Sequence, residues 1–146
     1  MSIEYKSRIP VADDVVAAFG RAMYNFAYLE WNIVWLAEKI QPGYIRGKRI
    51  TWDIGGKFSA LVNRHTQHHH DHIHLKNLAE EFVTLVKERH ALAHGNPHTA
   101  EGGKQRLLYD REGVRRDWSI EAMLNSAKDF EDAAIKANSL LHDGRL

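Results

Sequence analysis

The apolar positions of residues 11–40 recur at spacings of four and three, which is the pattern of an amphipathic helix that packs along its whole length. One row of apolar side chains consists of Val15, Phe19, Ala22, Phe26, Leu29, Ile33, Leu36 and Ile40. A second row beside it consists of Val16, Met23, Ala27, Val34 and Ala37. Together the rows cover most of the circumference, so we expect this helix to be buried by other helices of the chain or by a second copy.

The same periodicity predicts three further helices. Residues 41–43, Gln-Pro-Gly, end the first helix, and a short second helix is expected near residues 53–64. A third runs from about residue 71 or 72 to His94, and its buried stripe includes Arg89. The last helix runs to about His142 with Ser119 as its N-cap. Its predicted apolar stripe is Leu124, Ala127, Phe130, Ala134, Ala137 and Leu141.

Residues 95–118 lose the helical period. The segment is rich in turn residues, and two short strands around residues 110–113 are expected to form a hairpin. We therefore predict an all-α fold: an up-and-down bundle of about four main helices with a β-hairpin-like insertion before the last helix. The length of 146 residues fits a single domain over residues 1–146.

Composition places the chain among soluble globular proteins, with 44% apolar and 27% charged residues. The absence of cysteine excludes disulfides and thiolate metal sites, and it is typical of a cytoplasmic protein. The first ten residues have no signal-peptide pattern, and no run of eighteen apolar residues predicts a membrane span. We expect a cytoplasmic protein that does not enter a membrane.

The formal net charge of +1 does not indicate a nucleic-acid-binding protein, but the distribution of the basic residues is uneven. Two segments predicted to be non-helical, residues 41–52 and 104–116, are locally basic. Such loops can attract phosphates on a protein that is neutral overall, although a solvated surface has the same composition. The candidate substrate-binding residues are Arg46, Lys48, Arg49, Arg106, Arg115 and Arg116.

Six of the ten histidines lie in residues 65–74. His68 and His72 are one helical turn apart, as are His70 and His74, so the tract is expected to bind metal ions adventitiously. A dedicated site needs three or four ligands that converge in a fixed geometry, and this tract lies at the junction of two helices. We predict a pH-sensitive, solvated junction and neither a metal nor a cofactor.

The end of the third helix, RHALAHGNP, allows three interpretations. His90, His94 and His98 are spaced like metal ligands, but Ala91 stands where a zinc-protease helix needs glutamate. Alternatively, cations here complement the helix dipole, with Gly95 as the expected left-handed stop. The third interpretation is a phosphate-cleaving site, because arginine binds phosphate as a bidentate fork and histidine can move the proton of a ribose 2′-hydroxyl.

Two geometric conditions follow for a phosphate site. Arg89 and His94 are five residues apart, which separates them by about 140° on a regular helix. They can act together only if the helix end unwinds or if two copies pool their side chains across a two-fold axis. Glu30 lies among apolar neighbours in the first helix and needs a partner there, for which Arg89 is the first candidate.

At these residues the sequence resembles the HEPN superfamily (higher eukaryotes and prokaryotes nucleotide-binding), and in particular its small bacterial members. The resemblance covers the layout of roughly residues 12–142. The matching residues are Leu29 and Glu30 in the first helix, Gly55, Gly56 and Lys57 in the second, and the Arg-x4-His-Gly stretch from Arg89 to Gly95. The family commonly has asparagine or aspartate after the arginine, whereas this chain has His90.

The resemblance implies a homodimer whose paired motifs form one cleft and, in active members, metal-independent RNA cleavage that leaves a 2′,3′-cyclic phosphate. The leading hypothesis is a HEPN-like endoribonuclease that acts as a toxin or phage-defence component, with an antitoxin or defence-system partner. Arg89 would stabilise phosphorane charge, His94 would act as general base or acid, His90 would assist, and Glu30 would orient Arg89 or His94. The rivals are a non-catalytic HEPN-like nucleotide-binding or protein-interaction module and, more distantly, a metal-dependent hydrolase that uses the histidines.

Overall fold

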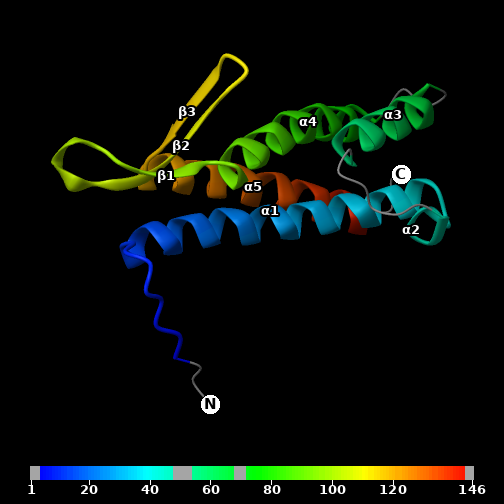
Figure 1. Cartoon of the computed structure of the whole chain (residues 1–146). Coiled ribbons are helices and arrows are strands. Elements are labelled where there is room, and N and C mark those ends of the chain that lie inside the picture. The colour runs from blue at the N-terminus through cyan, green and yellow to red at the C-terminus, as the bar shows by residue number, and fades with distance from the viewer. Residues whose placement is uncertain (1–3, 48–53, 68–71, 144–146) are drawn as a thin grey trace.

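The computed structural model describes residues 4–47, 54–67 and 72–143 and confirms a helical bundle with a small antiparallel sheet before the last helix (Figure 1). The helices are α1 (Asp13–Ile40), α2 (Tyr44–Gly47), α3 (Ile54–Thr66), α4 (Ile73–Ala93) and α5 (Ile120–His142). The strands are β1 (Asn96–Thr99), β2 (Gln105–Arg111) and β3 (Val114–Trp118), with a 3-10 turn, η1 (Glu101–Gly103), between the first two.

Helices α1 and α5 lie side by side and run in the same direction (Figure 1). Three hydrogen bonds fix their register, and the partners advance together along both helices. Asn25 donates to the Ala127 carbonyl at 3.0 Å, and Lys39 donates to the Leu141 carbonyl at 2.6 Å. Between these two bonds, Asn138 donates to Asn32 at 3.1 Å. In a strict up-and-down order the first and last of four helices are antiparallel, so the topology differs from the predicted one in this respect.

Helices α3 and α4 form an antiparallel pair that covers one side of α1 and α5 (Figure 1). Gly55 at the start of α3 lies against α4 so closely that a Cβ there would be 3.2 Å from Val86 Cγ2. Phenylalanines from four helices meet in the core: Phe26 lies 6.1 Å from Phe82 and 5.2 Å from Phe130 between ring centroids, and Phe58 lies 6.1 Å from Phe82. The core therefore joins both helix pairs into one unit.

The predicted apolar rows are only partly buried. In the second row of α1, Val34 and Ala37 are buried, whereas Val16 is 51% exposed and Ala27 is also exposed. On α5, Leu124 was assigned to the buried stripe but is exposed, because the adjacent Met123 faces the core instead. The chain covers the C-terminal half of α1 more completely than the N-terminal half.

The sheet has the order β1-β2-β3, with both pairs antiparallel. The hairpin expected around residues 110–113 is confirmed: Glu112 and Gly113 adopt φ of 53° and 78°, as a tight primed turn between β2 and β3 requires. The sequence did not predict β1, because Asn96 and Pro97 are typical turn residues. Proline is tolerated in β1 because this strand lies at the edge of the sheet.

Two helix ends test the predicted caps. Ser119 caps α5 as expected and accepts a hydrogen bond from the Ala122 amide at 3.1 Å. The left-handed stop predicted at Gly95 is wrong, since Gly95 is absent from the residues with positive φ in the described chain. Glycine is required there for space, because a Cβ on Gly95 would lie 3.0 Å from the Leu107 Cβ of β2. Among the described helices, none combines the length and apolar character needed to cross a bilayer.

Candidate functional site

Arg89 lies near the end of α4, His90 lies in its last turn, and His94 follows as the C-cap residue. The regular helix stops because His94 leaves the helical conformation, with φ −100° and ψ 11°. Its amide still donates to the His90 carbonyl at 3.0 Å, and the chain then enters β1. The residues of the predicted motif thus lie where the helical bundle meets the sheet.

Arg89 packs its guanidinium against α1. The Arg89 Cζ lies 5.2 Å from the centroid of the Phe26 ring, a cation–π arrangement, and the Arg89 Nε is buried without a hydrogen-bond partner. Throughout the described ranges, no carboxylate forms an ion pair with this guanidinium. The expected partner Glu30 is half-buried one helical turn beyond Phe26, and the structure does not join it to Arg89. Among the described residues, Arg89 is therefore a half-buried cation without an anionic partner.

His90 and His94 form an exposed pair. Their ring centroids are 4.4 Å apart and the rings are tilted by 48°. Tyr109 of β2 approaches the other side of His90, with 6.1 Å between ring centroids and an edge-on angle of 78°. Two neighbouring imidazoles on the surface can together accept and donate protons, provided that a substrate reaches them.

Arg89 and the two histidines face different neighbours in one chain. Arg89 lies against α1, whereas His90 lies beside Tyr109 of the sheet and pairs with His94. None of the hydrogen bonds, ion pairs or ring contacts of the described residues joins Arg89 to either histidine. The separation expected from the five-residue spacing is therefore retained, even though the helix ends before His94.

A groove of about 580 Å³ lies beside the histidine pair, between the outer face of α4, the start of α3 and the β2–β3 hairpin. Gly55, Val86 and Tyr109 contribute to its mainly apolar wall, and His90 and Lys87 bring polar groups to it. Its position next to His90 means that any molecule bound at the histidines would also contact this wall.

The three arginines predicted as phosphate ligands in the sheet are ion-paired. Arg106 contacts Asp117 at 3.0 Å, and Arg115 contacts Asp110 at 3.5 Å on an exposed surface. Arg116 forms a bidentate pair with Glu88 of α4, one contact being 2.9 Å, and its Cζ lies 4.5 Å from the Trp118 ring centroid. These pairs tie the hairpin together and to α4, so they leave less positive charge for a phosphate than the sequence suggested.

The other predicted basic segment lies away from the motif. Arg46 is exposed in α2, which Figure 1 places at the end of the bundle opposite the sheet. Lys48 and Arg49 lie outside the described residues. Arg46 therefore does not belong to the site at the end of α4.

No metal centre emerges from the part of the histidine tract that the structure describes. His65 and His72 approach each other to 5.3 Å between ring centroids, while His68, His69 and His70 lie outside the described residues. Across residues 4–47, 54–67 and 72–143, no group of three or more histidine, aspartate or glutamate side chains is arranged to hold a metal ion.

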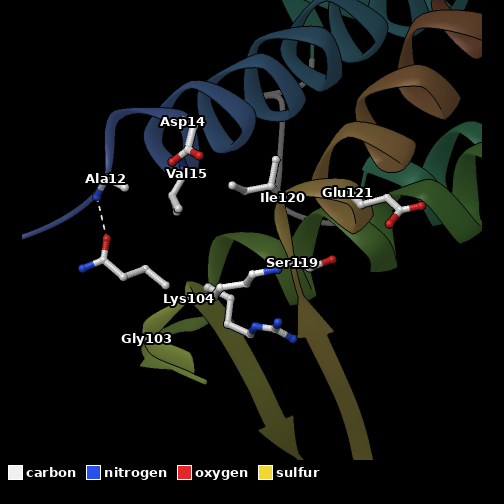
Figure 2. A pocket seen from close by; sticks show the side chains of 10 residues that line it. Ala12, Asp14, Val15, Gly103, Lys104, Ser119, Ile120 and Glu121 are labelled. Carbon is white, nitrogen blue, oxygen red and sulfur yellow. Dashed lines mark hydrogen bonds between the residues drawn. The ribbon is translucent and has the colours of Figure 1, made fainter. Parts of the chain in front are cut away.

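A second pocket, of about 690 Å³, lies where α1 and α5 begin (Figure 2). Because the two helices are parallel, both N-termini border it, and Lys104 adds a positive charge. Asp14 and Glu121 also line it (Figure 2), and Arg106 at its edge is already paired with Asp117. The mixture of charges gives this pocket no preference for an anion.

Sequence reasoning missed two residues that shape the α4 site, Phe26 beneath Arg89 and Tyr109 beside His90. Both contacts join residues far apart in the chain, and no local pattern signals them. In comparisons with protein-family models, curated proteins and solved structures, nothing matches this chain. The functional argument therefore rests on these residues and on the resemblance of the motif.

Proposed function

We propose that the end of α4 is an RNA-binding and RNA-cleaving site of HEPN type in a homodimeric protein. The observation that carries the proposal is the state of Arg89: a half-buried guanidinium with no carboxylate partner among the described residues. A cation held this way is incomplete without an anion, and a phosphate diester would supply one. The exposed His90 and His94 pair at the same end of α4 provides groups for proton transfer.

Each residue has a distinct role in the proposed reaction. His94 accepts the proton of the ribose 2′-hydroxyl or returns one to the leaving 5′-oxygen, and His90 supports it through the adjacent ring. Arg89 stabilises the charge that develops on the phosphorane. The 2′-oxygen attacks phosphorus, the bond to the 5′-oxygen breaks, and a 2′,3′-cyclic phosphate and a 5′-hydroxyl result. No metal ion takes part.

The site is proposed to be composite. Arg89 and His94 diverge in one chain, so Arg89 of one protomer would act with His94 of its partner, while Glu30 would position Arg89 at the shared cleft. The proposal also includes a cytoplasmic location. It further includes a role as a toxin or phage-defence component, with an antitoxin or defence-system partner.

The test compares His94→Ala and Arg89→Ala with the wild type on single-stranded RNA in the presence of EDTA. His94→Ala should reduce cleavage by about 10²–10⁴-fold and leave RNA binding intact, because it removes only proton transfer. Arg89→Ala should weaken both binding and cleavage. His98→Ala, an exposed histidine on β1, serves as the matched control and should change neither.

Three results would contradict the enzyme. These are a wild type that cuts no RNA, cleavage that survives in His94→Ala, and cleavage that EDTA abolishes and zinc or manganese restores. The last result would favour the metal-dependent hydrolase. Melting temperatures of all variants must match before their rates are compared, since Arg89 also packs on Phe26.

The second candidate is a non-catalytic HEPN-like nucleotide-binding or protein-interaction module. It is favoured by the ion pairs of Arg106, Arg115 and Arg116, which leave a weakly charged surface near the motif. RNA binding without cleavage in the wild type would support the nucleotide-binding form of this module. Absence of both activities would support the protein-interaction form.

A further inference from the structure

Four aromatic side chains lie uncovered along one face of α1. The exposed fractions are 69% for Tyr24, 51% for Tyr28, 49% for Trp31 and 43% for Trp35. We call these four residues the aromatic stripe. Large aromatic side chains are normally among the main contributors to buried surface, and a row of four in twelve residues marks an interaction surface.

We propose that a second copy of this chain docks on the aromatic stripe, with the two α1 helices antiparallel across a two-fold axis. The inference goes beyond the proposed function, because it rests on the stripe and not on the motif or on RNA chemistry. Its first support is the spacing of the stripe, which is four, three and four residues. This is the spacing of a seam between two long helices, and α1 has 28 residues, or about 42 Å of length.

The area of the stripe fits a second copy. An aromatic side chain buries about 150–250 Å² when fully covered, so at these exposures the stripe still offers on the order of 400 Å² per copy. Two stripes face to face remove about 800 Å², and the flanking apolar side chains of Ile135 and Ala27 bring the total toward the roughly 1,000 Å² of a specific interface.

The stripe is also self-complementary when the helices are antiparallel. With the axis midway between Tyr28 and Trp31, Tyr24 faces the partner's Trp35 and Tyr28 faces the partner's Trp31. The same register sets the exposed Arg21 against the partner's Glu38, so opposite charges close both ends of the seam. Glu38 is fixed in place, because its carboxylate accepts hydrogen bonds at 3.0 Å from the amides of Gly43 and Ile45.

Two local features of the stripe favour packing against a partner helix. Trp31 and Trp35 already contact each other edge to face, with 5.9 Å between ring centroids and an angle of 85°. A hollow of about 290 Å³ between α1 and α5, lined by Tyr24, Tyr28 and Ile135, offers a place for an aromatic ring of the partner.

The stripe lies on the side of α1 opposite to Phe26. At about 100° per residue, the four residues of the aromatic stripe lie between about 140° and 200° from Phe26. Phe26 is buried beneath Arg89, whereas the stripe is exposed. A second copy on the stripe therefore packs on the side of α1 that faces away from Arg89.

Cysteine cross-linking tests the register, since the natural chain contains no cysteine. Tyr24→Cys and Trp35→Cys chains with tags of different size are mixed and oxidised. Antiparallel pairing predicts a disulfide between the two different chains. It predicts none between two Tyr24→Cys chains, whose residues would be about 16 Å apart along the helix, beyond the reach of a disulfide. Disulfides between identical chains only would overturn the antiparallel arrangement.

Light scattering at micromolar concentration tests the surface itself. The wild type should have the mass of a dimer and Trp31→Lys that of a monomer. Ile73→Lys, at a residue 58% exposed on α4, is the matched control and should remain dimeric. A monomeric wild type or a dimeric Trp31→Lys would refute the proposal, as would a monomer whose tryptophan fluorescence responds to RNA, which would assign the stripe to base stacking.

These measurements need no RNA cleavage. A chain that dimerises through the stripe and cuts nothing would refute the ribonuclease and leave the interface standing. Cleavage by a monomer would refute both the interface and the composite form of the site, and would leave RNA cleavage itself standing.

Discussion

At the scale of single residues, the two glycines of interest differ in what surrounds them. Gly95 lies between the end of α4 and β2, where a Cβ would be 3.0 Å from Leu107 Cβ and 3.3 Å from the Leu92 carbonyl oxygen. Gly20 lies within α1 with nothing within 4 Å of its Cβ position. The first glycine is needed for close packing of backbone and side chain, whereas the second only weakens the helix that contains it.

The two positions therefore predict opposite effects of the same substitution. Gly95→Ala should destabilise the protein by about 1–3 kcal/mol, the usual cost of forcing an extra group into a packed site. Gly20→Ala should stabilise it by about 0.5–1 kcal/mol through helix propensity. Urea unfolding of both variants at one protein concentration measures the difference. A neutral Gly95→Ala would mean that β2 can move away from α4 at little cost.

At the scale of elements, the apolar periodicity was sufficient to predict the helices that pack against other helices of the same chain. The boundaries of α1, α4 and α5 and the N-cap Ser119 follow from local pattern, because each depends on residues close in sequence. The parallel course of α1 and α5 depends on contacts such as Asn32 with Asn138, 106 residues apart, which no local pattern encodes. Strand β1 was missed for a similar reason, since only its pairing with β2 makes Asn96–Thr99 a strand.

The candidate site likewise contains features that the sequence predicted and features that it did not. The sequence located Arg89, His90 and His94 at a helix end, but it paired Arg89 with Glu30, whereas the guanidinium lies over Phe26. It also predicted basic side chains near the motif, but it did not predict the acidic side chains that pair with them, such as Glu88 with Arg116. The aromatic stripe was not predicted, since the exposure of a side chain depends on what the other helices cover.

The junction between α1 and α2 predicts a pH dependence. Hydrogen bonds from the Ile45 amide and then the Gly43 amide lower the pKa of Glu38 below its ordinary value. A carboxyl group whose pKa is lower in the folded state stabilises that state above its unfolded pKa of about 4.3, and the effect is lost as the pH falls through the lower value. Glu38→Gln should therefore melt below the wild type at neutral pH, and the gap should close in acid.

Thermal melts followed by circular dichroism between about pH 7 and pH 3 would measure this gap. Glu80→Gln is the control, because Glu80 is exposed on α4 and makes no hydrogen bond in the described chain. A concentration series separates the capping role of Glu38 from its proposed contact with Arg21, since only the dimer contact depends on protein concentration. A constant gap at all pH values would show that the amide bonds do not depend on the charge of Glu38.

At the scale of the whole molecule, the arginines of the sheet that were predicted to bind phosphate are already ion-paired. The chain carries a net charge of +1, and ion pairs engage Arg106, Arg115 and Arg116. Arg46 lies at the far end of the bundle from the motif (Figure 1). In the described part of the chain these three arginines add little net positive charge near the motif, so under the proposed function we expect RNA to be bound through a few contacts near Arg89 and the histidine pair.

This distribution predicts a weak salt dependence of RNA binding. Each phosphate neutralised on a single strand contributes about 0.7 to the slope of log affinity against log salt concentration, so one or two contacts give a slope of about −0.7 to −1.4. Fluorescence anisotropy with a single-stranded 2′-O-methyl oligoribonucleotide, whose blocked 2′-oxygens cannot attack the phosphate, measures the slope without turnover. Arg89→Ala should reduce its magnitude by about 0.7, the share of one phosphate.

Arg106→Ala should leave the slope unchanged, because its charge is already balanced by Asp117 at 3.0 Å. A slope near −4, or one that flattens in Arg106→Ala but not in Arg89→Ala, would place the RNA on the sheet and move the site away from the end of α4.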